Sequence, residues 1–254
     1  METKYTVYQP GYGLPSLTIV YEDNHLLACV KPVGILSQED NTGKPDMLTL
    51  LKQYLKETYN KPGNVWLSLL HRLDQPVGGL MLFAKTSKAA SRLSEQIRQK
   101  HWQKFYLAVT HGVPEANCGN WQDYISTAKQ AGKFCVVKKP CLPTKQQAKT
   151  KALAKRCELN YACLKTITYA EEQLSLLKIE LVTGRRHQIR VQTSNRNLPL
   201  VGDRLYGEQK SKLDHQSLGP ALYAYELGFT HPISKEKMVL QAPMPNALPF
   251  NLFA

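Results

Sequence analysis

Alternation of apolar and polar residues is the feature that most constrains how this 254-residue chain folds. Residues 174–182 alternate along their whole length, and both faces carry apolar side chains, which predicts a strand in the middle of a sheet. Further runs with strand character are 17–30 (two strands around a turn at 22–25), 67–73, 79–84, 104–110, 161–169, 221–229 and 237–242. We therefore expect strands to dominate the structure.

Helical periodicity is confined to three segments. Asp46 is expected to cap a helix that continues to about residue 59, and Ser87 to cap a second helix that continues to about residue 100. A short third helix is expected over residues 187–195. Because these helices do not alternate regularly with the strands, we predict an α+β fold on a mixed, largely antiparallel sheet rather than a doubly wound fold.

The chain shows no internal repeat, low-complexity tract or long linker, so we predict a single domain over residues 17–254 after an N-terminal extension, residues 1–16. No apolar run approaches the ~18 residues that a membrane span needs. The first residues carry no secretory or transit signal, which favours the cytoplasm. The six cysteines form no C-x-x-C pair, so we expect free thiols.

The chain is basic, with 33 lysines and arginines against 20 acidic residues. No acidic residue lies between Asp123 and Glu158, and the stretch 129–156 contains nine basic residues. Such a stretch is typical either of a solvated surface or of a site for a polyanion. The nine are Lys129, Lys133, Lys138, Lys139, Lys145, Lys149, Lys151, Lys155 and Arg156.

A second basic group lies in a region that we expect to be ordered. It consists of Arg185, Arg186, Arg190, Arg196 and Arg204. Arginine pairs bidentately with phosphate, and a helix that begins just after a glycine offers further N–H donors to an anion. The group therefore suits a nucleic-acid backbone, although a capped surface helix with solvated arginines would have the same sequence.

Asp74 lies at the end of an apolar run and directly before a turn rich in Pro and Gly, 75–79. A carboxylate at such a position is held rigidly and is open to a cleft, which suits catalysis. The alternative is that Asp74 only caps the turn and pairs with Arg72, while His71 is a satisfied core histidine. Other chemistries lack their residues, since there is no H-E-x-x-H, no phosphate loop, no nucleophile elbow and no deaminase pattern.

Several motifs occur in an order and at spacings that are similar to those of the RluA-type pseudouridine synthases. They are K-P-x-G at 31–34, H-R-L-D at 71–74, K-x-Y-x-A at 104–108, G-R-x-H-Q-I-R at 184–190 and G-D-x-x-Y-G at 202–207. The resemblance extends from about Ile19 to Pro245 and so covers nearly the whole chain.

The resemblance implies an isomerase that converts uridine in tRNA or rRNA to pseudouridine. The bond from base nitrogen 1 to sugar carbon 1′ breaks, and the base rejoins through its carbon 5. No cofactor and no metal are implied. The fold implied is a mixed sheet with flanking helices around a central basic cleft. We expect RNA as the partner, no membrane, no obligate protein partner and a monomer.

The resemblance also assigns roles to single residues. Asp74 matches the family's catalytic aspartate, and its role as nucleophile or as base stays open. Arg185 matches the arginine that pairs with this aspartate, which keeps the carboxyl ionised. Tyr106 matches the tyrosine that lies against the target uracil, and Ile189 supplies an apolar wall on the other side of the base. Arg72 matches an arginine that fills the space left by the flipped nucleotide.

Contacts to the RNA backbone are expected from Lys138, Lys139, Lys149, Lys151 and Arg190. The chain departs from the common family pattern at 77–79, where Val-Gly-Gly replaces Thr-Ser-Gly, and at Arg186, where Thr or Ser is usual. We also expect no small extra RNA-binding domain, because about sixteen residues precede the first predicted strand. The alternative of another class is an RNA chaperone or assembly factor of the same fold with incidental or lost activity.

Overall fold

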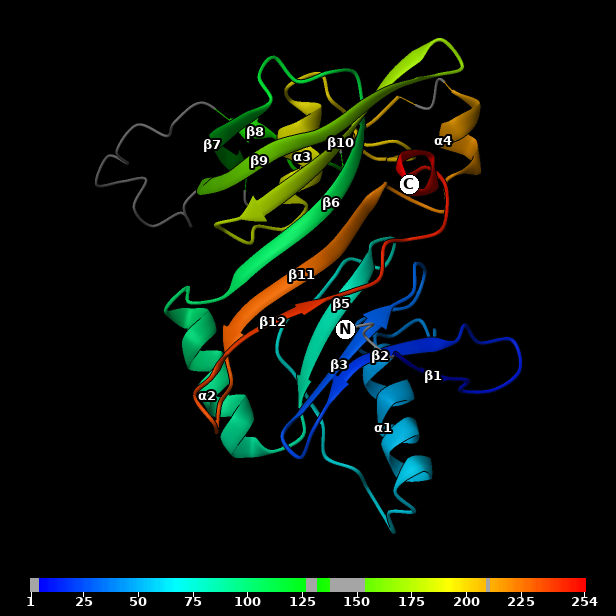
Figure 1. Ribbon diagram of the computed structural model, residues 1–254, viewed down its shortest axis with the longest axis vertical. Coiled ribbons are helices and arrows are strands. Elements are labelled where there is room, and N and C mark those ends of the chain that lie inside the picture. The colour runs from blue at the N-terminus through cyan, green and yellow to red at the C-terminus, as the bar shows by residue number, and fades with distance from the viewer. Residues whose placement is uncertain (1–4, 127–131, 138–153, 209–210) are drawn as a thin grey trace. The chain divides into compact units, whose positions relative to one another are not determined.

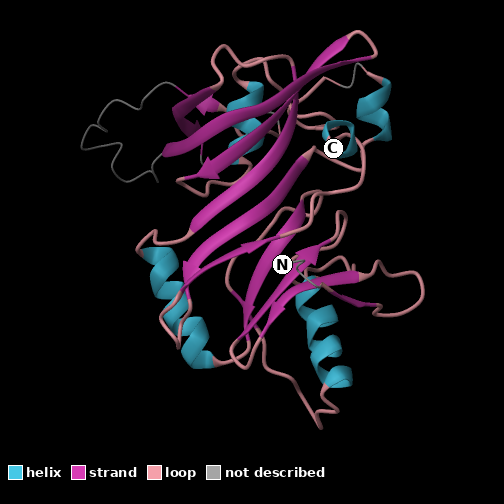
Figure 2. Ribbon diagram, viewed as in Figure 1, coloured by secondary structure: helices cyan, strands magenta, loops and turns pink. Residues whose placement is uncertain are grey.

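The computed structural model describes residues 5–126, 132–137, 154–208 and 211–254. Strands make up most of the regular structure in these ranges (Figure 2). The strands are β1 (Thr6–Tyr8), β2 (Leu17–Glu22), β3 (Leu26–Lys31), β4 (Ser68–Leu69), β5 (Gly78–Ala84), β6 (Gln103–His111), β7 (Cys118–Ser126), β8 (Val136–Val137), β9 (Ala154–Tyr169), β10 (Glu172–Leu181), β11 (Leu222–Thr230) and β12 (Lys237–Gln241). The helices are α1 (Met47–Thr58), α2 (Ser87–Arg98), α3 (Gln188–Ser194), α4 (Lys212–Gln216) and the 3-10 helix η2 (Phe250–Phe253).

The chain forms two compact units. Unit 1 consists of Met1–Lys104 and Tyr223–Met244, and unit 2 consists of Phe105–Leu222 and Pro245–Ala254. Both β6 and β11 carry the chain from one unit to the other.

The strands of unit 1 follow the order β1-β2-β3-β5-β11, with β12 paired to β11 and β4 paired to β5. All these pairs are antiparallel except β5 with β11, whose parallel register joins Gly78 to Tyr223 and Gly79 to Ala224. β5 is buried along its whole length, as expected for a strand with neighbours on both sides. The sheet is therefore mixed.

Helix α1 of unit 1 begins at Asp46, whose side chain accepts a hydrogen bond from the Thr49 N–H, as the sequence predicts. Its buried face includes Tyr54, whose ring packs edge-on against the Tyr8 ring at 5.0 Å and whose hydroxyl donates to Glu22 at 2.8 Å. Helix α1 therefore lies beside the N-terminal strands (Figure 1).

Helix α2 is capped by Thr86 instead of Ser87, because the Thr86 hydroxyl accepts from the Ala89 N–H. The Gln96 side chain then exchanges two hydrogen bonds with the backbone of Thr230, at 2.8 and 3.0 Å. This exchange fixes α2 to the end of β11.

Unit 2 contains an antiparallel sheet in the order β6-β10-β9-β7-β8. β10 lies between β6 and β9, and apolar side chains from both of its faces are buried, which confirms the prediction for residues 174–182. Helix α3 is joined to the sheet by a small core of Ile125, Phe134, Cys157 and Val191.

The predicted mixed, largely antiparallel sheet with flanking helices is confirmed, and the central basic cleft and the domain boundaries stay predictions. Of the predicted strand 67–73, only β4 forms. β1 pairs with β2 although it falls in residues 1–16, which the sequence indicates as an extension. The predicted hairpins of the basic stretch 129–156 lie mostly outside the described residues. None of the described helices is long and apolar enough to span a membrane.

Candidate active site

Asp74 begins a tight turn that leads into β5. Its carbonyl oxygen accepts a hydrogen bond from the Val77 N–H at 2.9 Å, and its side chain is half-buried. Gly79, the second residue of β5, has a φ of +121°. A Cβ at that position would lie 2.3 Å from the Ala224 carbonyl oxygen, so only glycine lets β5 and β11 meet there.

The ammonium group of Lys31 binds the backbone of this turn. Its side chain is fully buried, and Nζ donates to three carbonyl oxygens, those of Pro32 at 3.0 Å, Ile35 at 2.6 Å and Gln75 at 3.0 Å. Burial lowers the pKa of Lys31 to about 8, and the negative charge of Asp74 opposes that decrease. The three protons of the ammonium group are thus all used, and the group lies within electrostatic reach of Asp74.

Two further contacts hold the chain on either side of Asp74. The backbone N–H of Gly34 donates to the Gln75 carbonyl at 2.9 Å, and the Gln75 side chain donates back to the Gly34 carbonyl at 3.0 Å. The Ser37 hydroxyl donates to the Leu73 carbonyl at 2.8 Å and accepts from the Leu73 N–H at 3.1 Å. The segment 31–37 therefore fixes both neighbours of Asp74, which is what a pre-positioned catalytic carboxylate requires.

Sequence reasoning found part of this arrangement. Lys31 and Gly34 stand out only as members of K-P-x-G, without a physical role, and Ser37 was missed. A lysine at the end of an otherwise apolar strand is the signal that could have indicated a buried cation. Nothing in the sequence marks the contact of Ser37 with Leu73, which lies 36 residues away.

His71 is a satisfied core histidine, as the sequence reading has it. Its Nε2 accepts a hydrogen bond from the Leu82 N–H at 3.0 Å, which places the proton of the neutral ring on Nδ1. Burial, together with the charge of Lys104, lowers the pKa of His71 to about 3. The ring is therefore neutral and does not serve as an acid. Arg72 next to it is exposed, and no described residue forms a hydrogen bond or ion pair with its guanidinium group.

Arg185 lies in the bend between β10 and α3, and its side chain is exposed while Nε donates to the Arg156 carbonyl at 3.0 Å. The bend is held by Gln188, which is 2% exposed. Its side-chain oxygen accepts from the Arg185 N–H at 3.0 Å and from the Thr183 hydroxyl at 2.8 Å, and its Nε2 donates to the Glu158 carbonyl at 3.0 Å. The glutamine of G-R-x-H-Q-I-R, Gln188, thus fixes the backbone of Arg185.

Arg190 is not an RNA contact. Its guanidinium group is buried and forms two parallel hydrogen bonds with the Asp203 carboxylate, at 2.7 and 2.6 Å. Asp203 is itself buried and accepts from the N–H groups of Leu205 and Tyr206. The predicted contact of Arg190 with the RNA backbone is therefore wrong, because both charges are already neutralised inside unit 2. Sequence alone does not distinguish a buried arginine from an exposed one.

Arg196 is also engaged within the protein. Its Nη1 donates to Asp123 at 2.8 Å, and its guanidinium group lies 4.6 Å from the centre of the Trp121 ring. Arg186 and Arg204, by contrast, are exposed. Of the second basic group, Arg185, Arg186 and Arg204 are thus exposed, whereas Arg190 and Arg196 pair with carboxylates inside unit 2.

Tyr106 lies in β6 opposite Ile179 of β10 and is 9% exposed, and Ile189 in α3 is 4% exposed. Asp74 and Arg72 belong to unit 1, whereas Tyr106, Arg185 and Ile189 belong to unit 2. The pairing of Asp74 with Arg185 therefore stays a prediction. Four predicted backbone contacts lie outside the described residues: Lys138, Lys139, Lys149 and Lys151.

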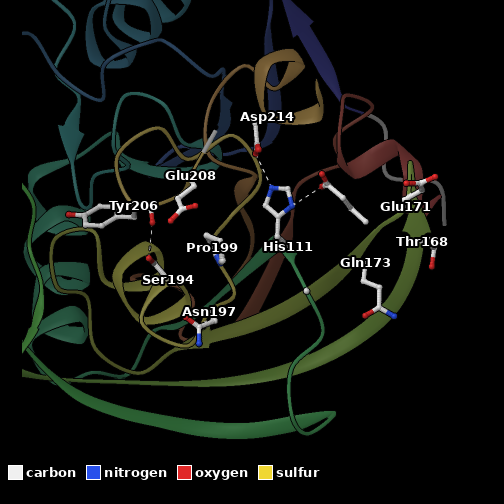
Figure 3. Close-up of a pocket in the computed structure, with 12 residues that line it drawn as sticks. His111, Thr168, Glu171, Gln173, Ser194, Asn197, Pro199, Tyr206, Glu208 and Asp214 are labelled. Carbon is white, nitrogen blue, oxygen red and sulfur yellow. Dashed lines mark hydrogen bonds and ion pairs between the residues drawn. The ribbon is translucent and has the colours of Figure 1, made fainter. Parts of the chain in front are cut away.

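Unit 2 also contains a pocket of about 910 Å³ (Figure 3). Its centre is His111, whose ring nitrogens lie 2.9 Å from Asp214 and 3.2 Å from Glu172. The acidic residues along its wall are Glu171, Glu172, Glu208 and Asp214. A wall with four carboxylates disfavours phosphate, so we assign no RNA contact to this pocket.

The comparisons with known proteins define the class. The family model described as RNA pseudouridylate synthase matches residues 25–195. The chain therefore belongs to the RNA pseudouridylate synthase family, and it is an isomerase of uridine in RNA. Among the described residues, no three His, Cys, Asp or Glu side chains are grouped so that they could hold a metal ion.

Individual relatives cover most of the chain. It is 33% identical over 93% of its length to the uncharacterized RNA pseudouridine synthase YhcT of Bacillus subtilis, of which it covers 70%. It is 33% identical to tRNA pseudouridine synthase C of Haemophilus ducreyi, over 89% of this chain and 90% of that one. It is 30% identical to ribosomal large subunit pseudouridine synthase C of Salmonella typhimurium, over 91% and 67%.

Solved structures show the same fold. Human RNA pseudouridylate synthase domain containing 4 superposes with a TM-score of 0.69 at 22% identity, over 89% of this chain and 88% of that chain. Human RNA pseudouridylate synthase domain containing 1 gives 0.68 at 22% identity, over 91% and 85%.

Proposed function

We propose that this protein converts specific uridines of a structured tRNA or rRNA to pseudouridine, with Asp74 as the catalytic aspartate. The observation that carries the proposal is the anchoring of the Asp74 turn by Lys31, Gly34 and Ser37, which fixes one half-buried carboxylate at the start of a buried strand. The names of the relatives support both kinds of RNA, since one is a tRNA enzyme and another acts on the large ribosomal subunit.

The chemistry requires an ionised carboxylate. Asp74 either attacks sugar carbon 1′ or removes a proton from carbon 2′, and both steps need the negative charge. The bond from nitrogen 1 to carbon 1′ breaks, the uracil turns, and its carbon 5 bonds to carbon 1′. The proton of carbon 5 then leaves to solvent, and nitrogen 1 takes up a proton. Product and substrate have the same atoms, so the reaction itself needs no oxidant and no group donor.

The target nucleotide must leave the stack. Carbon 1′ of a stacked residue is hidden, and flipping costs a few kcal/mol, least in a loop. In our proposal Tyr106 and Ile189 contact the flipped uracil, Arg72 fills the space that it leaves, and Arg185 pairs with Asp74. The exposure of Arg72 and Arg185 supports these assignments, because each side chain is accessible from solvent.

The substitution Asp74→Asn tests the proposal. Asn keeps the size of the side chain and removes its charge, so we expect pseudouridine formation to disappear while RNA affinity stays within about twofold. Asp40→Asn is the matched control, because Asp40 is an exposed carboxylate of the same unit. Tritium release from RNA labelled at uracil carbon 5 measures turnover, and filter binding measures affinity.

Mapping pseudouridines in RNA from cells with and without the protein identifies the target. Sites that disappear with the protein and return with the parent chain, but not with Asp74→Asn, establish the function. Tight RNA binding without any change in the pseudouridine map would instead show an assembly factor of the same fold. Turnover by Asp74→Asn would contradict the assignment of Asp74.

A further inference from the structure

A side-chain cluster next to the Asp74 segment is not used by the mechanism above. Nζ of Lys104 lies 5.4 Å from the centre of the Trp102 ring. Both residues come just before Tyr106 in the sequence. The Trp102 ring packs edge-on against His71 at 5.5 Å, and it packs at a tilt against Phe229 at 5.9 Å. The cluster therefore lies against the residues that lead directly to Asp74.

No carboxylate of the described residues neutralises Lys104. It is half-buried, and within the described ranges no carboxylate pairs with it and no acceptor receives a hydrogen bond from Nζ. The other buried lysines of unit 1 differ, since Lys31 donates to three carbonyls and Lys85 pairs with Glu22 at 2.6 Å. Burial lowers the pKa of Lys104, because its ammonium group has lost water without gaining an anion.

Trp102 provides an independent sign of a missing acceptor. The residue is 7% exposed, and its Nε1–H is buried without a hydrogen-bond partner in the part of the chain that the structure describes. Buried donors are nearly always satisfied, so a water or a ligand atom is expected to accept from this N–H. His71 does not supply it, because its Nε2 is occupied by the Leu82 N–H and its Nδ1 carries a proton.

We propose that Lys104 and Trp102 bind one phosphate of the RNA backbone beside the nucleotide on which Asp74 acts, an inference that rests on the function proposed above. Phosphate oxygens accept from an ammonium group and from an indole N–H, and one phosphate presents several oxygens. Side chains alternate along a strand, so Lys104 and Tyr106 lie on the same side of β6, about 7 Å apart. The bound phosphate is thus adjacent to the side chain that we assign to the uracil.

Phosphate scanning tests this inference. The probe is a short hairpin RNA whose loop nucleotides are all uridine, with one neutral methylphosphonate placed at each loop linkage in turn. For the parent protein we expect the Kd to rise roughly tenfold at one linkage, which is the loss of one charge-assisted contact. Lys104→Gln should bind the unmodified hairpin more weakly than the parent by the same factor. The methylphosphonate at that one linkage should then weaken the binding of Lys104→Gln no further.

Matched variants separate the contact from general effects of charge and folding. Lys104→Arg keeps the charge and should restore affinity, while Lys88→Gln removes an exposed lysine of α2 and should respond to every linkage as the parent does. Trp102→Phe keeps an aromatic ring and removes the N–H. We expect this variant to bind the unmodified hairpin at least threefold more weakly than the parent, through loss of the contact with that same phosphate. Thermal melting of each variant shows whether it is folded.

The outcomes are distinct. The phosphate site is overturned if Lys104→Gln binds the unmodified hairpin as tightly as the parent. It is also overturned if the affinity lost through Lys104→Gln adds to the affinity lost through the methylphosphonate at every linkage. Unchanged affinity of Trp102→Phe would remove the indole from the site. Turnover of the parent on the unmodified hairpin and on cellular tRNA and rRNA is measured separately, so a failure of the proposed function does not mimic a failure of the phosphate site.

Discussion

Nζ of Lys31 lies 3.0 Å from the carbonyl oxygen of Gln75, the residue that follows Asp74. A buried cation thereby holds the backbone of the proposed catalytic turn, although Lys31 is at the end of β3 and Gln75 lies in the turn before β5. The protonation of Lys31 is for this reason linked both to folding and to the position of Asp74.

The first prediction concerns the stability of the fold as a function of pH. The pKa of Lys31 is lowered from 10.5 to about 8, so between these values the folded chain has released a proton that the unfolded chain still binds. The unfolding free energy of the parent should therefore rise, relative to that of Lys31→Met, by up to about 3 kcal/mol from pH 8 to pH 10.5. Urea titrations of both proteins across this range measure it. Parallel curves would contradict the linkage.

Ser37→Ala removes the hydroxyl that both donates to and accepts from Leu73. Two buried backbone groups next to Asp74 lose their partner, so we expect a loss of about 1–3 kcal/mol in stability. Turnover at saturating RNA should fall at least tenfold with little change in affinity, since Asp74 is no longer held in place. Ser91→Ala, an exposed serine of α2, is the control. Parent-like turnover in Ser37→Ala would remove Ser37 from the positioning of Asp74.

Tyr106→Phe separates the ring from the hydroxyl. If the hydroxyl assists removal of the proton from carbon 5, turnover drops while RNA affinity stays close to that of the parent, because the stacking ring is retained. Tritium release and filter binding give the two quantities. An unchanged rate would limit Tyr106 to a packing contact with the base.

Arg190→Met leaves the Asp203 carboxylate buried without its partner. We expect a loss of about 3–5 kcal/mol in unfolding free energy, measured by urea titration. Arg204→Gln, which alters an exposed arginine, should change stability by less than about 0.5 kcal/mol. Equal effects of the two substitutions would show that the Arg190–Asp203 pair does not stabilise unit 2.

The basic stretch gives a prediction that depends on salt. Replacing Lys138, Lys139, Lys149 and Lys151 by Gln removes up to four phosphate contacts, each worth roughly 0.7 in the slope of log affinity against log salt. We expect weaker binding and a flatter slope, with turnover at saturating RNA near that of the parent. A long structured RNA should be affected more than a short stem-loop. Unchanged affinity and slope would make the stretch a solvated surface.

The sequence predicted those strands and helix caps that depend only on residues close together in the chain. The two-sided alternation of 174–182 predicted β10, because the pleat places successive side chains on opposite faces. The cap at Asp46 was predicted for the same reason, since it needs only residues within one turn. The second cap was placed one residue late, at Ser87 instead of Thr86, as two adjacent hydroxyls compete for one position.

Long-range relationships were not predicted. Nothing within the segment around Ser37 indicates that its hydroxyl meets Leu73, and nothing near Arg190 shows that Asp203 neutralises it thirteen residues later. Both contacts depend on how distant segments pack, and no periodic pattern of residues in the sequence indicates either of them. Asp74 was found through its motif, while the buried contacts that hold it came only from the structure.

The parallel pairing of β5 with β11 sets the order in which the enzyme is completed during synthesis. Gly79 pairs with Ala224, so 145 residues (224 − 79) are added after Gly79 before its partner exists. At ordinary rates of translation this takes roughly 7 to 30 s, a long interval for an apolar strand with an open edge. A ribosome that stalls within unit 2 therefore holds a chain that already contains Asp74 but has no finished sheet to support it. We expect such nascent chains to be targets of chaperones rather than premature enzymes.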